Sequence, residues 1–98
     1  MIPKDIANQI YDLLKEHVGA SEYWRDDFVF SLEKPLKYSS SEFRFQGNLD
    51  FGGKFRRSEY SGWYVDFYKE DETPEKLENV KKVNILLKAL KDKHPNIV

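Results

Sequence analysis

The chain is poor in several residue types on which common protein functions depend. It has 98 residues, with no cysteine, two histidines and one methionine. The absence of cysteine excludes a disulfide framework, a C-x-x-C motif and a thiol nucleophile, and it favours a cytoplasmic location. No apolar run approaches the ~20 residues that a membrane span needs, so we expect no membrane association and no signal peptide.

An excess of charge of one sign is also missing. The 16 basic and 17 acidic residues give a net charge of −1, which argues against a uniformly basic binder of polyanions. The charges are nevertheless grouped in blocks, which either orient a binding partner or pair with one another on the surface. The net charge is −4 in segment 1–33, with 3 basic and 7 acidic residues, and +4 in segment 34–57, with 6 and 2. It is −5 in segment 58–79, with 2 basic and 7 acidic residues, and +4 in segment 80–98, with 5 and 1.

Two segments show helical periodicity, one near each end of the chain. In residues 3–18, apolar side chains recur at spacings of three and four, and Gly19 is suited to a left-handed helix end. Residues 74–93 carry a broad apolar stripe of valines and leucines. Thr73 followed by Pro74 is a favourable helix start, because the hydroxyl caps the helix and proline suits its first position. We therefore expect helices at about 3–18 and 74–93.

The middle of the chain alternates between apolar and polar residues, which is the period of a half-buried strand. The alternation is most regular after residue 42, where Phe43 and Phe45 fall on one side and Arg44 on the other. The pair Gly52-Gly53 is typical of a tight turn between antiparallel strands. We therefore expect strands at about 27–33, 42–51, 54–59 and 62–69.

This order of elements predicts one α+β domain that spans residues 1–98. The simplest arrangement is a two-layer sandwich: an antiparallel sheet of three to four strands, with both helices on one face. The odd-numbered side chains from Phe43 to Phe67 are then expected to face the helices. The even-numbered side chains of the same strands are expected on an open face.

The residues available for catalysis are few and isolated. His17 and His94 lie far apart in the sequence, and neither has a carboxylate or nucleophile at a spacing typical of a catalytic site. The acidic clusters lack the ligand spacing and glycine turn of a cation-binding loop. The segment Gly-Gly-Lys at 52–54 lacks the surrounding pattern of a phosphate-binding loop. We therefore expect a protein that is not an enzyme, with no catalytic residue, no metal site and no cofactor.

The open sheet face is where we expect function to reside. Arginine and tyrosine are enriched at interface hot spots, so the leading hypothesis is a small protein-binding domain of adaptor, inhibitor or immunity type. The alternative is a module that binds single-stranded nucleic acid or RNA on the same face, with arginine on phosphate and tyrosine stacked on bases. We also consider a homodimer formed through exposed strands. The candidate partner-binding residues are Arg44, Arg56, Tyr64, Asp66 and Tyr68.

Overall fold

The fold combines helices with one antiparallel sheet. The computed structural model describes residues 1–36, 38, 40–46, 52–68 and 72–97. Within these residues the sheet has three strands in the order β1-β2-β3, both pairs antiparallel, so the predicted α+β class is confirmed. The elements are α1 (Lys4–Val18), the 3₁₀ turn η1 (Glu22–Trp24), α2 (Arg25–Glu33), β1 (Ser40–Gln46), β2 (Gly52–Ser58), β3 (Gly62–Phe67) and α3 (Pro74–Asp92).

The first and last helices begin and end close to the predicted residues. Gly19 follows α1 in the left-handed conformation, with φ of 69°, and its N–H donates to the carbonyl of Leu14. The side chain of Thr73 accepts a hydrogen bond of 3.2 Å from the N–H of Lys76 at the start of α3. Local capping chemistry therefore determines these boundaries, as the sequence indicated.

The predicted strand at 27–33 is wrong, because these residues lie in helix α2. The alternating order of Phe28, Phe30 and Leu32 suggested a strand. The buried residues are instead Phe28, Val29 and Leu32, which share one side of a helix, while Phe30 is 60% exposed. The ring of Phe28 packs between α1 and the sheet, with its centroid 5.0 Å from that of Tyr11 and 5.1 Å from that of Phe55.

The predicted turn at Gly52-Gly53 is also wrong, because both glycines belong to β2. The predicted strand 42–51 is seen as β1 up to Gln46, and residues 47–51 lie outside the described residues. Gly53 pairs with Phe45 across the strands, and a Cβ atom at Gly53 would lie 2.7 Å from the Phe45 ring. The glycine therefore makes room for an aromatic ring within the sheet rather than forming a turn.

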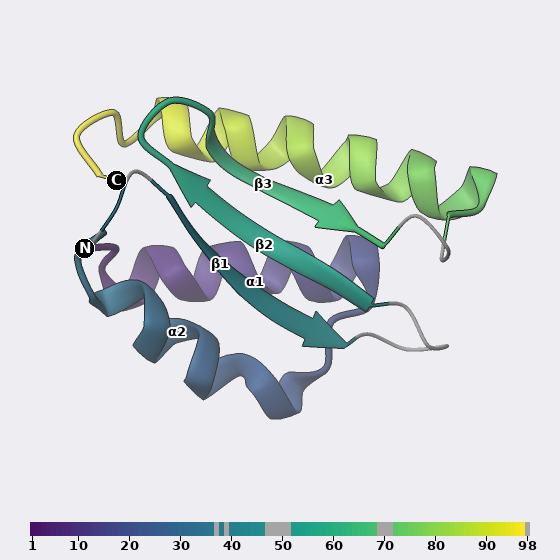
Figure 1. The fold of residues 1–98 in the computed structure, drawn as a ribbon, viewed down its shortest axis with the longest axis horizontal. Helices are drawn as coiled ribbons and strands as arrows, with labels where there is room; N and C mark the ends of the chain where they lie inside the picture. The colour runs from purple at the N-terminus through teal and green to yellow at the C-terminus, as the bar shows by residue number, and fades with distance from the viewer. Residues whose placement is uncertain (37, 39, 47–51, 69–71, 98) are drawn as a thin grey trace.

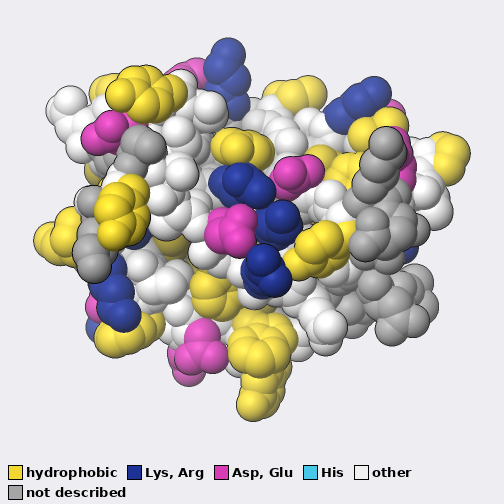
Figure 2. Space-filling view, viewed as in Figure 1, with side chains coloured by type: hydrophobic (Ala, Val, Ile, Leu, Met, Phe, Trp, Pro, Cys, Tyr) yellow, Lys and Arg dark blue, Asp and Glu magenta, His cyan; other side chains and the backbone are white. Residues whose placement is uncertain are grey.

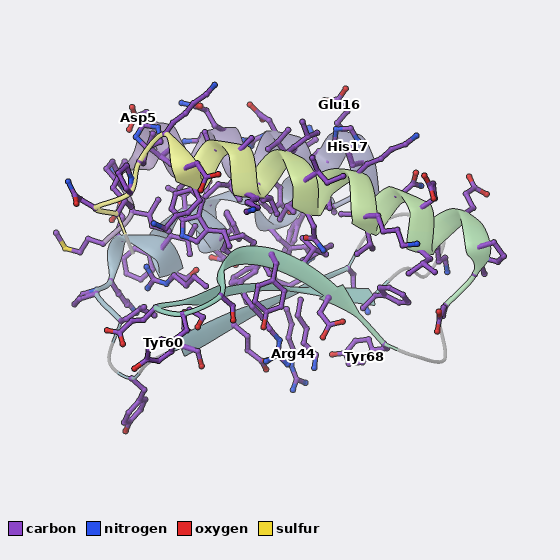
Figure 3. The ribbon with its side chains drawn as sticks, turned by 90° about the horizontal axis from the view of Figure 1, so that it is seen from above. Asp5, Glu16, His17, Arg44, Tyr60 and Tyr68 are labelled. Atoms are coloured by element: carbon purple, nitrogen blue, oxygen red, sulfur yellow. The ribbon has the colours of Figure 1, made fainter. Side chains whose placement is uncertain are left out.

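The two faces of the sheet differ as the alternation predicted. Phe45, Phe55, Trp63 and Val65 are buried in the core. Figure 1 shows α1 crossing behind the sheet, with α2 along β1 and α3 along β3, and Figure 3 shows the helices on one side of the sheet. Among the described helices, none has the length and apolar character needed to cross a bilayer.

One arginine lies on the inner face instead of an apolar side chain. Arg57 is only 3% exposed, and burial lowers the pKa of its guanidinium. It donates to the carbonyls of Leu32 at 3.2 Å and Lys34 at 2.6 Å, and to the hydroxyl of Ser41 at 3.0 Å. Arg57 therefore joins the C-terminal end of α2 to the sheet by satisfying carbonyls that the helix leaves free.

Groups from elsewhere in the chain occupy part of each sheet edge. The side-chain oxygen of Asn84 accepts from the N–H of Val65 at 2.7 Å, and its amide donates to the carbonyl of Val65 at 3.1 Å. At the other edge, the N–H of Ser21 donates to the carbonyl of Gln46 at 3.2 Å. These contacts limit the pairing of a further strand with either edge, so the broad surface of the sheet is the better candidate for binding.

Candidate functional site

The side of the sheet that faces away from the helices carries a cluster of charged and aromatic side chains, which we call the outer face. Figure 2 shows lysine and arginine side chains gathered over the middle of the sheet, with acidic side chains beside them. In Figure 3, Arg44 and Tyr68 project away from the helices. The outer face comprises Glu42, Arg44, Lys54, Arg56, Tyr64 and Asp66 from the three strands, together with Tyr68 just after β3.

The strand register arranges these residues in two rows across the sheet. In one row, Arg56 stands between Glu42 on β1 and Tyr64 on β3. In the other row, Lys54 on β2 stands between Arg44 on β1 and Asp66 on β3. The rows are two residues apart along β2, so they share one side of the sheet.

The carboxylate of Glu42 lies between two guanidinium groups. Its Oε1 is 3.4 Å from Nε of Arg44, and its Oε2 is 3.4 Å from Nη2 of Arg56. Charge-assisted contacts of this kind are usually about 2.7–2.9 Å long, so Glu42 holds both arginines loosely. Nε of Arg56 is buried and has no hydrogen-bond partner among the described residues.

Lys54 and Asp66 are opposite one another without pairing. The ammonium of Lys54 lies 5.2 Å from the centre of the Tyr68 ring, a cation–π arrangement. Oδ1 of Asp66 accepts a hydrogen bond of 2.9 Å from the N–H of Phe67. In the part of the chain that the structure describes, no ion pair joins Lys54 to Asp66.

Arg44 and Lys54 form a like-charged pair across β1 and β2. Val65 directs its backbone groups at Asn84 and away from β2. In an antiparallel ladder, hydrogen-bonded and non-hydrogen-bonded residue pairs alternate along the strands. Counted from Val65 through the register of β2, Arg44 and Lys54 form a non-hydrogen-bonded pair. In such a pair the Cα atoms are about 4.5 Å apart and the side chains are closest. Like charges directly opposite one another are destabilising, and a bound anion would reduce that repulsion.

The structure brings the candidate residues onto one surface. Arg44, Arg56, Tyr64 and Asp66 all lie on the outer face, and Tyr68 lies at its end beneath Lys54. Glu42 and Lys54 are not among the candidates predicted from the sequence, although alternation places Lys54 on the open face. The signal that would have identified Glu42 is its even-numbered position two residues before Arg44. Its placement opposite Arg56 depends on the strand register, which the sequence does not specify.

The described ranges also bear on the metal-binding and histidine expectations from the sequence. Histidine, aspartate and glutamate side chains form no group of three or more there that could hold a metal ion. His17 lies near Glu16 on the helical side, and Figure 3 shows both on the opposite side of the molecule from Arg44. In comparisons with known proteins, no family model, curated protein or solved structure matches this chain. The chemistry of the outer face is therefore the basis for assigning a function.

Proposed function

We propose that this protein is a small non-enzymatic domain that binds another protein through its outer face, as an adaptor, inhibitor or immunity-type protein does. The observation that carries the proposal is the clustering of Arg44, Lys54 and Arg56 on a sheet surface that faces away from the helices. In this proposal, the helices and the sheet form a two-layer sandwich that leaves the binding surface open. The site of action is the cytoplasm, in keeping with a chain that has no cysteine.

The composition of the outer face supports a protein partner. Arginine and tyrosine supply much of the binding energy at protein interfaces, and here Arg56 and Tyr64 are register neighbours. Glu42 and Asp66 break the positive surface into separate charges. Such alternation of charge favours the discrimination of one protein surface from another, because each misplaced like charge opposes binding.

A second candidate is the binding of single-stranded nucleic acid to the same surface. The observation in its favour is that Tyr64 and Tyr68 accompany the cations, since bases stack on aromatic rings and phosphates contact arginine. Both acids of the outer face oppose this candidate, because they repel a continuous phosphate backbone.

Affinity capture from the native host tests the protein-binding proposal. The bait is the wild-type chain or a variant carrying Arg56→Glu or Tyr64→Ala, and Lys82→Glu on the exposed side of α3 is the matched control. We expect the wild type and the control to retain the same partner and both outer-face variants to lose it, with unchanged circular dichroism spectra. Retention of that partner by both outer-face variants would show that the binding surface is elsewhere.

A titration with single-stranded oligonucleotides of mixed sequence separates the two candidates. Fluorescence anisotropy at low salt would be measured for the wild type and for the Arg56→Glu variant. We expect no binding by either protein. Binding by the wild type alone, with affinity that falls steeply as salt is raised, would assign the outer face to nucleic acid instead.

A further inference from the structure

The outer face contains its own acidic group at the centre of its arginines. We propose that the Glu42 carboxylate occupies the place of a carboxylate from the partner, and that an acidic segment of a partner protein displaces it on binding. This inference rests on the proposed function and specifies the chemistry of the partner. It assigns Arg44 and Arg56 as the carboxylate-binding pair and Glu42 as an internal competitor.

Another arginine of this protein, Arg25, forms short ion pairs with which the contacts of Arg44 and Arg56 can be compared. Nε of Arg25 is 2.5 Å from a carboxylate oxygen of Glu22, and its Nη2 is 2.6 Å from Oδ1 of Asp12. The contacts of Glu42 with Arg44 and Arg56 are both 3.4 Å. Because Coulomb attraction and hydrogen-bond strength fall with distance, the carboxylate of Glu42 is more readily displaced than those around Arg25.

The two arginines also have unused capacity to bind a carboxylate. The Arg44 side chain is 69% exposed, and its one hydrogen bond to a described residue is the long contact with Glu42. The Arg56 side chain is 34% exposed, and the contact of its Nη2 with Glu42 is equally long, at 3.4 Å. A guanidinium presents five donors in a planar fork that matches a carboxylate, so an incoming acidic side chain can form shorter bonds than Glu42 does.

The repulsion between Arg44 and Lys54 provides a second reason for binding an acid here. These two cations are cross-strand neighbours, while the nearest acid to Lys54 in the register, Asp66, accepts from the backbone of Phe67. A carboxylate placed over the pair interacts favourably with both cations. The free protein therefore carries an electrostatic cost that binding removes.

The arrangement favours carboxylates of a protein over the phosphates of a nucleic acid. Glu42 and Asp66 lie on either side of the cations in the two rows. A phosphate backbone carries a charge at every nucleotide and meets these acids as it crosses the sheet. An acidic protein segment can place one or two carboxylates over the arginines and direct other side chains at Tyr64.

Isothermal titration with hexaglutamate tests this inference on the full chain. We expect wild-type protein to bind the peptide with an affinity that falls as salt is raised. Glu42→Gln preserves shape but removes the competing charge, so it should bind about threefold more tightly. Arg56→Gln should abolish measurable binding, whereas Lys82→Gln on α3 should leave the affinity unchanged.

Several results would overturn the inference. One is that the wild type does not bind hexaglutamate. Another is that Glu42→Gln binds the peptide no more tightly than the wild type does. A third is that Lys82→Gln loses as much affinity for the peptide as Arg56→Gln does. Tighter binding of oligothymidylate than of hexaglutamate would likewise contradict a carboxylate partner. The affinity capture with Arg56→Glu does not depend on the peptide, so it shows separately whether the proposed function fails.

Discussion

Individual arginine residues have three different roles in this chain. Arg25 joins three helical segments through Glu22 and Asp12, Arg57 is buried at the end of α2, and Arg44 and Arg56 lie on the outer face. Alternation in the sequence separated Arg56 from Arg57, because neighbouring residues of a strand point to opposite sides. It did not reveal that Arg57 bonds to the carbonyls of α2, since that contact depends on a helix predicted to be a strand.

Gly53 is the residue whose replacement most directly tests the packing of the sheet. In Gly53→Ala, the new methyl group would meet the Phe45 ring at 2.7 Å. We expect a loss of about 1–3 kcal/mol in the free energy of unfolding, as is usual for an overpacked core. Urea denaturation of Gly53→Ala, of Phe45→Leu and of the double variant would check this, because Phe45 is buried and its truncation alone also lowers stability. The double variant should lose less than the sum of the two single losses, and strictly additive losses would contradict the steric clash.

At the scale of whole elements, the sequence predicts a helix correctly where capping residues and apolar periodicity indicate the same boundaries. Helix α3 was predicted from Thr73, Pro74 and the apolar stripe that follows, and it was found almost to the residue. Helix α2 was missed because it has only 9 residues, so its apolar pattern fits a strand as well as a helix. Packing of Phe28 against α1 and the sheet determines its conformation.

The connection between α1 and α2 depends on an ionised carboxylate. Hydrogen bonds from Arg25 and then Lys15 lower the pKa of Glu22 from 4.5 to about 2. A lowered pKa in the folded state means that Glu22 contributes stability above about pH 4.5 and that this contribution is lost as the pH falls to about 2. We therefore expect wild-type protein to exceed Glu22→Gln in unfolding free energy by a constant amount at neutral pH, and the two to converge at pH 2.

Urea denaturation of both proteins at several pH values measures that convergence. A second variant, Glu16→Gln, is a control for the general effect of removing an acid from the same helical region, because Glu16 is exposed. Its difference from wild type should stay small across the range. A gap between wild type and Glu22→Gln that persists unchanged to pH 2 would contradict the assigned role of Glu22.

At the scale of the whole molecule, the grouping of charge along the sequence corresponds to different locations in the fold. The positive block 34–57 supplies the three cations of the outer face and also the buried Arg57. The positive block 80–98 lies largely on α3, where Lys81, Lys82 and Lys88 are exposed. The sequence predicted the composition of the open face by alternation. It did not predict that the register would place Glu42 between two arginines.

The two positive blocks are the alternative locations for the acidic partner that we propose, and amide NMR distinguishes them directly. Isotope-labelled protein would be titrated with hexaglutamate, and the amide shifts would be followed residue by residue. We expect the largest changes on the outer face, at Glu42, Arg44 and Arg56, with helix α3 unaffected. Changes concentrated at Lys81, Lys82 and Lys88, with the strands unaffected, would contradict this expectation.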